Sequence, residues 1–514
     1  MREISGNFRS RFSDFAAAAV LVITLLFMLF LTLSAFLETV YISTDSESGE
    51  YVRINQDNIF LNIIALLLIM ASLYLFYRHR DELTLKRMEI VLVLWTLLFG
   101  TVFIFSTKLC APWYSDSFIV VDAARRAAVG DFSTFDTYFV RFPFQFGYVL
   151  YAELFFRTVY GLFPGLPEGY YCLALQELNL IWLVLSYHAL LKVCGNLFGS
   201  VRVQKMTALL LLFCFPAVIS CTFLYGSIPA FAFGTLALWM FSTFLRNDRL
   251  KYGLLCGLFL GVAVILKLNM LIFAVAVAIV WLIELMRKFS FKSLSCLIIA
   301  AVLVLTLGAL PQQIYEQRTG KEFGDGIPKI CWMAMGFSDG HAGPGWYKED
   351  NTVTAFAQHN YDGEATAEYA ENVLAKRLAY FRANPRDCLR FFSTKLISQW
   401  NEPSYESIWI NQVQLSYSEK GRIYELVCGK GEIVTGRLMN QFQQMVFLGT
   451  LLAALAMWKS RELRQCLPFV ILLGGIFYHL LFEAKSQYSL VYFILMVPAA
   501  ACGFCRLFEK IEKR

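Results

Sequence analysis

Apolar segments of about 20 residues recur along the chain and limit what it can fold into. About 20 helical residues cross the hydrocarbon core of a bilayer, and a helix satisfies its own backbone hydrogen bonds there. The composition agrees, because 58% of the 514 residues are apolar and only 16% are charged, against about a quarter in soluble domains. The sequence therefore predicts an all-α polytopic membrane protein.

The apolar runs predict a transmembrane helix bundle of about 11–13 spans. One long interval, 316–442, is polar and has no spanning run, which indicates a mixed soluble module. The predicted parts are an N-terminal transmembrane core at 1–315 that includes a large loop at 108–142, the module at 316–442, and C-terminal spans at 443–514. The predicted spans are 15–37, 59–77, 88–107, 143–163, 170–192, 206–224, 227–245, 252–267, 268–286, 293–315, 443–458, 466–482 and 487–507.

Lysine and arginine in the short loops predict the orientation, because such loops stay in the cytoplasm. The loop at 108–142 and the module then lie on the extracytoplasmic face. One conflict arises in this orientation. The basic stretch at 192–205 should be cytoplasmic, so an odd number of crossings must separate it from residue 142, but two apolar segments lie between them. Either 143–163 is re-entrant or lies along the outer surface, or one basic loop breaks the rule. The absence of any Asn-X-Ser/Thr sequon favours the plasma (inner) membrane of a bacterium.

Charge and cysteine usage exclude some classes of protein. The net charge of +6 is spread over many loops, which suits an anionic bilayer and predicts no nucleic-acid partner. The thirteen cysteines are scattered without a paired framework, so they are expected to be small apolar fillers. No H-E-x-x-H, G-x-S-x-G or Walker loop occurs, which argues against a metalloprotease, that type of serine hydrolase and an ATPase.

The segment "SDSFIVVDAARRAAVGDF" in the first large outer loop carries the strongest candidate for chemistry. It predicts a short helix with Asp116 near its start, where the helix dipole keeps a carboxylate ionised, as a general base must be. Asp122 and Arg126 are four residues apart and are expected to pair. The alternative is an N-cap aspartate beside a solvated ion pair.

The same loop resembles the GT-C superfamily of integral membrane glycosyltransferases, in the dolichyl-phosphate-mannose protein mannosyltransferase-like group. Those enzymes have an Asp, an Ala-rich helix, a Gly and a Tyr-Pro segment in their first outer loop. The counterparts here are Asp116, "DAARRAA", Gly130 and "YFVRFPFQFG". The chain departs from the pattern at Ser117, where many relatives have Glu, and at Phe142, where many have Tyr.

The resemblance implies that Asp116 is the base of an inverting transfer of a sugar from a polyprenyl-phosphate carrier. Asp122, Arg141 and Gln145 are candidate supporting residues. Ser117 leaves the second carboxylate without a counterpart, so the metal requirement stays open. A divalent cation, Mg or Mn, is one possibility, and no other cofactor is expected.

Cations are expected where the donor phosphate binds. Lys267, which lies between apolar runs at an outer turn, either reaches the interface or holds the phosphate, with Asn269 adding a hydrogen bond. The turn "FEAKSQY" between the last two spans has Glu483, Lys485 and Tyr488 near the place where family members bind donor phosphate or sugar. An ordinary polar turn is the alternative.

The module has Trp beside Gly, Pro and polar groups, which suits sugar contact, although aromatic belts at a membrane interface have the same composition. Trp400, Asn401 and Glu402 are the candidates for acceptor or sugar contact, and His341 is either a further contact or structural. The sequence thus predicts a glycosyltransferase with an envelope glycan, glycolipid or protein as acceptor. The alternatives are a lipid or polysaccharide transporter or flippase, and a non-catalytic envelope-assembly protein.

Overall fold

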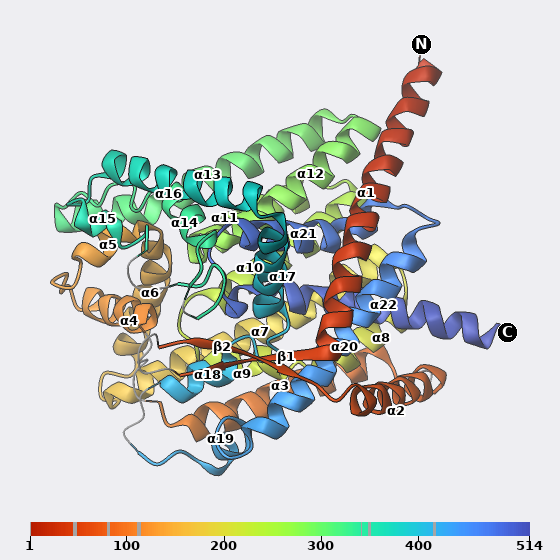
Figure 1. Cartoon of the computed structure of the whole chain (residues 1–514), viewed down its shortest axis with the longest axis horizontal. Helices are drawn as coiled ribbons and strands as arrows, with labels where there is room; N and C mark the ends of the chain where they lie inside the picture. Colours follow the sequence, from red (N-terminus) through yellow and green to blue (C-terminus); the bar gives the residue numbers. More distant parts are fainter. Residues whose placement is uncertain are drawn as a thin grey trace.

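The computed structural model describes residues 2–44, 49–79, 83–109, 115–340, 342–347, 351–414 and 418–513. These residues form a bundle of helices with helical layers at one end (Figure 1). Nine helices among them are long and apolar enough to cross a membrane. The prediction of an all-α polytopic membrane protein is therefore confirmed.

The nine candidate spans include most of the long helices. They are α1 (Arg2–Leu37, from Arg11), α2 (Ile59–Arg78), α3 (Leu85–Thr107), α7 (Glu168–Phe198), α10 (Ser227–Asn247), η3 with α12 (Leu268–Met270, Leu271–Arg287), α13 (Phe291–Thr319), η4 with α21 (Leu463–Cys466, Leu467–Leu481) and α22 (Ser486–Glu512).

The number of spans is lower than the 11–13 expected. A tenth is reached only if α8 (Val201–Leu212) is joined to α9 (Phe215–Ile219) and η2 (Ser220–Thr222) across a bend of 57°. α11 (Leu250–Leu266) is apolar but shorter than the nine candidate spans, so it is not counted among them. α20 (Glu432–Met457) is long, but its first half is polar, so its apolar part is too short to meet the same test.

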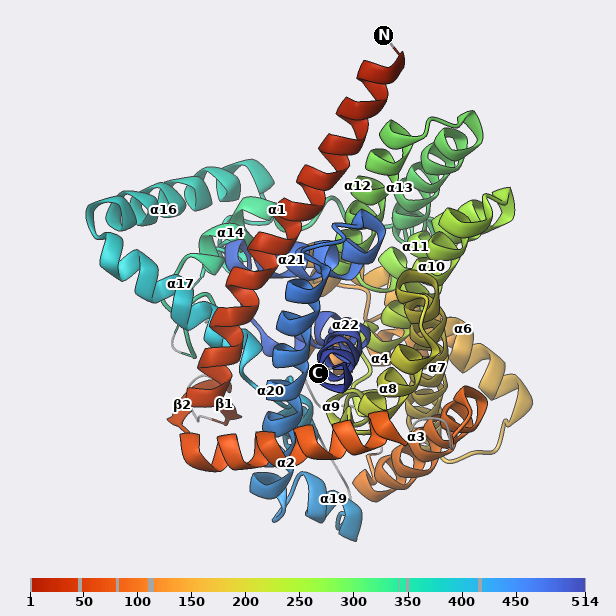
Figure 2. The same cartoon turned by 90° about the vertical axis from the view of Figure 1, so that its right-hand side faces the viewer.

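Helix α22 is the centre of the bundle. It contributes an almost unbroken run of buried residues from Ser489 to Cys505, and Figure 2 shows it nearly end-on in the middle of the other helices. α20, α21 and α8 pack around it. Because α22 runs from the turn after α21 to near the described C-terminus, it links the two ends of the bundle.

The interval 316–442 is helical in the described residues and does not form a separate body. Its helices are α14 (Lys329–Gly336), α15 (Ala355–Gln358), α16 (Gly363–Ala383), α17 (Pro385–Trp400), α18 (Ser407–Val413) and α19 (Arg422–Val427). α14, α16 and α17 share one apolar core, whereas α18 packs on α9 and α19 on α3. The predicted boundary at 442 falls inside α20.

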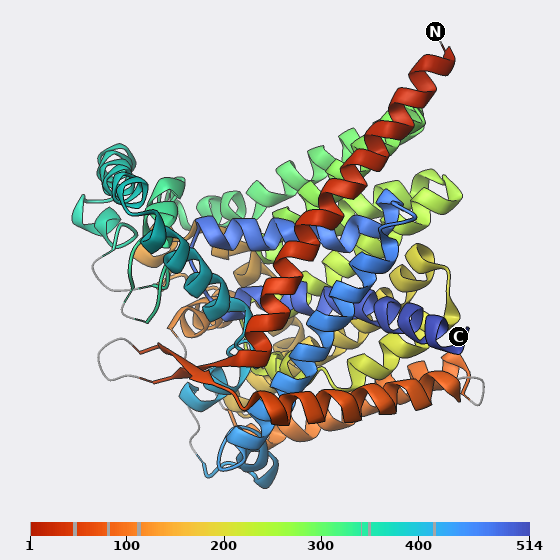
Figure 3. The ribbon, with the colours of Figure 1, turned by 45° about the vertical axis from the view of Figure 1, so that its right-hand side comes forward.

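A hairpin that the sequence analysis did not predict continues directly from α1 (Figure 3). Strands β1 (Glu38–Ser43) and β2 (Tyr51–Gln56) pair antiparallel, with Glu38 opposite Gln56. The Val40 amide donates to the Asn401 carbonyl at 3.0 Å, and the Val52 amide donates to the Ala342 carbonyl at 3.1 Å. The hairpin thus joins the end of α1 to the module.

The described residues from 115 to 162 form α4 (Ser115–Ala128), α5 (Thr137–Arg141), η1 (Pro143–Gln145) and α6 (Phe146–Leu162). α6 packs against α4 and α13 and is not among the candidate spans. Its buried Glu153 accepts hydrogen bonds from Tyr315 at 2.5 Å and from two nitrogens of Arg318 at 2.7 and 2.8 Å, and Arg157 adds a contact at 2.8 Å. This network ties α6 to the end of α13.

We expect Glu153→Gln to destabilise the protein, because it removes the charge that compensates the Arg318 guanidinium. Breaking one side of a buried pair costs about 3–5 kcal/mol. The unfolding midpoint in detergent should fall clearly below that of wild type. Asp122→Asn, which removes a partly exposed ion pair, serves as the control and should leave the midpoint almost unchanged. Equal midpoints for Glu153→Gln and wild type would contradict the role of the network.

Candidate functional site

Three predicted site residues meet around the side chain of Tyr225. The Tyr225 hydroxyl donates to Asp116 Oδ2 at 2.8 Å and accepts from the side-chain amide of Gln145. The Lys267 ammonium lies over the Tyr225 ring, 3.6 Å from its centroid, which is a cation–π contact. A carboxylate and a cation from segments far apart in the sequence therefore share one aromatic side chain.

Two local features bring Tyr225 to this position. The Ser117 hydroxyl is buried and donates to the Leu224 carbonyl at 3.1 Å, so the residue after Asp116 holds the residue before Tyr225. Gly226 has φ of +82°, and a Cβ there would lie 2.5 Å from the Leu266 carbonyl oxygen. A larger residue would push the Tyr225 turn away from Lys267.

The turn between α21 and α22 reaches the same cluster. The Tyr488 ring lies 5.8 Å from Lys267 Nζ, and the Tyr488 hydroxyl donates to Glu483 Oε2 at 3.1 Å. Lys485 instead pairs with Glu50 beside the hairpin, at 2.6 Å. The structure thus brings Tyr488 and Glu483 toward Asp116 and Lys267, and gives Lys485 a carboxylate partner.

Burial and neighbouring charges shift the pKa values of several side chains in this cluster. Desolvation lowers the pKa of the Lys267 amine to about 7, against the opposing effect of the Asp116 and Glu483 carboxylates. Burial raises the pKa of Glu483 to about 7, although the nearby Lys485 lowers it. Burial and the neighbouring Asp116 carboxylate hold the pKa of Tyr138 well above its usual value. The site therefore contains groups that change charge near neutral pH.

Other predicted supporting residues lie around this cluster. Asp122 forms the expected pair with Arg126, at 2.8 Å, on its own helix. Arg141 lies with its guanidinium 5.0 Å from the Phe142 ring centroid, and no described residue bonds to its buried Nε. Asn269 lies in η3, two residues after Lys267. The predicted helix start at Asp116 and the Asp122–Arg126 pair are both present.

The residues predicted for acceptor or sugar contact are packed inside the described structure. Trp400 and Asn401 are fully buried, and Glu402 is 2% exposed. Glu402 accepts hydrogen bonds from Ser404 and Ser486. Their role in binding an acceptor stays a prediction. His341 lies outside the described residues.

No group of three His, Cys, Asp or Glu side chains that could hold a metal ion occurs in the parts of the chain that the structure describes. At the position after Asp116, where many relatives have Glu, the Ser117 hydroxyl donates to the Leu224 carbonyl. We therefore assign no residues to a divalent cation.

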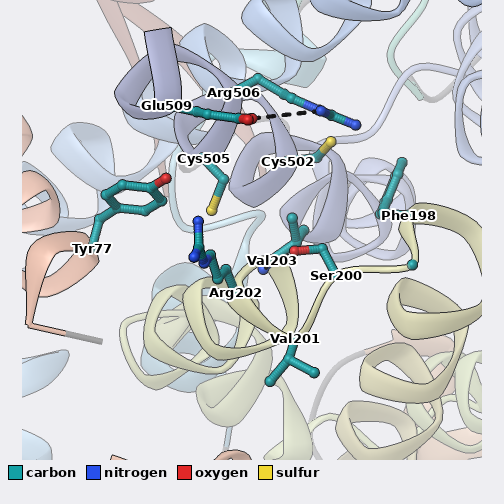
Figure 4. A pocket seen from close by; sticks show the side chains of 11 residues that line it. Tyr77, Phe198, Ser200, Val201, Arg202, Val203, Cys502, Cys505, Arg506 and Glu509 are labelled. Atoms are coloured by element: carbon teal, nitrogen blue, oxygen red, sulfur yellow. Dashed lines mark hydrogen bonds and ion pairs between the residues drawn. The ribbon is translucent and has the colours of Figure 1, made fainter. Parts of the chain in front are cut away.

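A cavity of about 470 Å³ lies far from the cluster, at the other end of α22 (Figure 4). Its lining includes Arg202, Cys502 and Arg506, and Arg506 pairs with Glu509 at 3.6 Å. Because a helix rises 1.5 Å per residue, Cys502 lies about 20 Å along α22 from Tyr488. This cavity is not part of the candidate site.

The chain is similar to known proteins in its central part. Residues 173–311 match the family model described as Dolichyl-phosphate-mannose-protein mannosyltransferase. The resemblance predicted from the sequence is confirmed. The matched region contains Tyr225 and Lys267, whereas Asp116 and the turn before α22 lie outside it. No curated protein matches the chain.

One solved structure that matches is the archaeal oligosaccharyltransferase AglB from Archaeoglobus fulgidus in complex with an inhibitory peptide and a dolichol-phosphate. It is 13% identical, with a TM-score of 0.38, and the match covers 82% of this chain and 51% of that one. The chain therefore spans about half the length of that structure.

We expect Gly226→Ala to disturb the Tyr225 turn. The left-handed conformation costs a residue with a side chain about 1–2 kcal/mol, and the added Cβ would approach Leu266 too closely. The unfolding midpoint should fall. Gly161→Ala is the matched control, because no atom lies within 4 Å of the added Cβ and alanine favours a helix. A variant at Gly226 as stable as the one at Gly161 would rule out this constraint.

Proposed function

We propose that this protein is an inverting membrane glycosyltransferase of the GT-C type that moves a sugar from a polyprenyl-phosphate carrier to an acceptor on the extracytoplasmic face. The observation that carries the proposal is the joint contact of Asp116 and Lys267 with Tyr225. A base and a phosphate-binding cation are the two groups that such a transfer requires. The family match over 173–311 supports the same reaction class.

In the proposed reaction Asp116 removes the proton from the acceptor hydroxyl as its oxygen attacks the anomeric carbon. The bond from that carbon to the phosphate oxygen breaks, the electron pair leaves with the lipid phosphate, and the sugar inverts. Tyr225 orients the Asp116 carboxylate through its hydroxyl. Holding the reactants and the base in this geometry supplies much of the rate.

Lys267 binds the donor phosphate in this proposal and offsets the charge that develops as it leaves. Arg141 Nε, which has no partner among the described residues, is a second group for the same phosphate. Asn269 and Lys485 remain predicted donor contacts. The acceptor is an envelope glycan, glycolipid or protein, and a bacterial plasma membrane is the proposed location.

We expect Asp116→Asn to lower kcat by about 10²–10⁴, because an amide cannot take the acceptor proton. Binding of the donor should persist. The measurement is release of labelled sugar from a panel of synthetic polyprenyl-phosphate hexoses and pentoses, with membrane extracts as acceptor. Asp122→Asn is the matched control and should keep the wild-type rate. Transfer by Asp116→Asn at the wild-type rate would refute the base assignment.

The role of Lys267 predicts a dependence of donor binding on pH. Its amine has a pKa of about 7 in the free protein, so it loses its positive charge as the pH rises through that value. The donor is a phosphodiester and keeps its negative charge, so the KM for the donor should rise above about pH 7. Lys267→Arg should remove this rise, because a guanidinium stays charged, and Lys267→Met should have a high KM at every pH. The same pH profile in all three proteins would contradict the assignment.

A further inference from the structure

The turn between α21 and α22 is held from outside by the module. α21 ends at Leu481 with Phe482 as its C-cap, and α22 begins at Ser486 with Lys485 as its N-cap. Each helix end leaves backbone groups without partners inside its own helix. At both ends, ionisable side chains from the interval 395–406 contact the ends of the helices.

Lys395 holds the end of α21. It lies on α17 and is fully buried, and its ammonium donates to the carbonyls of Gly336 at 2.6 Å, Leu480 at 2.9 Å and Phe482 at 2.7 Å. An ammonium has three donors, and all three are used. A cation is also favoured at a helix C-terminus, where the carbonyls point outward.

Glu402 and Glu406 hold the start of α22. Glu406 Oε1 accepts from the Gln487 amide at 3.2 Å, and it lies 3.1 Å from the Ser486 hydroxyl. Glu402 Oε2 lies 3.0 Å from the same hydroxyl. Both glutamates are buried. Acidic groups at a helix N-terminus complement its exposed N–H groups.

The contacts of Ser486 define the charges of the two glutamates. A serine hydroxyl has one hydrogen, so it satisfies both contacts best when one carboxyl group is protonated and donates to it. Burial raises the pKa of both carboxyl groups. Glu402 accepts from the Ser404 amide and hydroxyl and from the Glu406 amide, which opposes that rise, so Glu406 is the better place for the proton.

We propose that Lys395, Glu402 and Glu406 form a clasp that positions the 482–488 turn toward the donor. Through these three positioning residues, the module supports binding of the donor during sugar transfer. The reason is that the turn brings Glu483 and Tyr488 to Lys267, while both of its ends are fixed by the clasp. The evidence for the clasp is its hydrogen bonds. Only the identity of the ligand, a polyprenyl-phosphate sugar, rests on the proposed function.

Two isosteric changes distinguish the members of the clasp. In Glu402→Gln one amide nitrogen must face a backbone N–H, because both carboxylate oxygens accept from one. In Glu406→Gln the nitrogen can take the place of Oε2, which has no partner among the described residues, and the oxygen still accepts from the Gln487 amide. Only the proton that Glu406 gives to Ser486 is lost. Glu402→Gln should therefore open the clasp, whereas Glu406→Gln should only weaken it.

Hydrogen–deuterium exchange of the full-length protein in detergent tests the clasp without relying on activity. We expect Glu402→Gln and Lys395→Met to raise the exchange rate of the 482–488 amides by about tenfold, which corresponds to the loss of one charged hydrogen bond. Glu406→Gln, which loses only the proton given to Ser486, should raise the exchange rate less than Glu402→Gln does. If one of these variants fails to fold, Ser486→Ala is measured in its place. It removes only the bridging hydroxyl and should also raise the exchange rate of the turn. Wild-type exchange in folded Glu402→Gln and Lys395→Met would overturn the clasp.

Kinetics with the panel of polyprenyl-phosphate sugars tests the positioning role. We expect the variants that open the clasp to raise the donor KM by about tenfold with kcat within about twofold, since the clasp does not touch Asp116. Faster exchange of the turn with an unchanged KM would overturn this role. If wild type consumes no donor, the proposed function fails, whereas the exchange result still decides whether the clasp exists.

Discussion

The hydrogen bond from Tyr225 to Asp116 is the interaction on which the arrangement of the candidate site depends. Tyr225 lies just before α10, and its hydroxyl and ring contact residues from α4, η1 and the link before η3. The Asp116 carboxylate contacts the hydroxyl and the Lys267 ammonium contacts the ring. One side chain thus joins a carboxylate and a cation from distant parts of the chain.

Buried polar groups organise the end of the bundle that carries the candidate site. Glu153 fastens α6 to α13, and Lys395 fastens α17 to the end of α21. Each of these charges has several hydrogen-bond partners, which offsets the cost of desolvation. The module therefore contributes rigidity to the turn before α22, and its buried tryptophan is part of that packing.

Much of this site could be predicted from local sequence. Asp116 stands at a helix start and Asp122 lies four residues before Arg126, and both features depend only on short-range spacing. Lys267 is conspicuous because it interrupts an apolar run. Tyr225 has no such local signal, because its role comes from contact with Asp116, more than 100 positions earlier in the chain.

Contacts across long separations explain what the sequence analysis missed. Lys395 and Glu406 resemble ordinary polar residues of a soluble segment until α21 and α22 are in place. The polar first half of α20 is similar: Gln443 donates to the Trp400 carbonyl and Gln444 to the Ala35 carbonyl. Hydropathy describes each residue without its hydrogen-bond partners. It therefore underestimates how deeply the polar half of such a helix is buried, and it does not predict the β1–β2 hairpin.

The close packing of α20 on α22 has a consequence for mutations far from the site. A Cβ at Gly503 would lie 2.0 Å from the Gly449 carbonyl oxygen, so the two backbones touch where α22 approaches the cavity end. A side chain at Gly503 would therefore have to displace one of these two helices, and α22 is the helix whose first turn carries Tyr488.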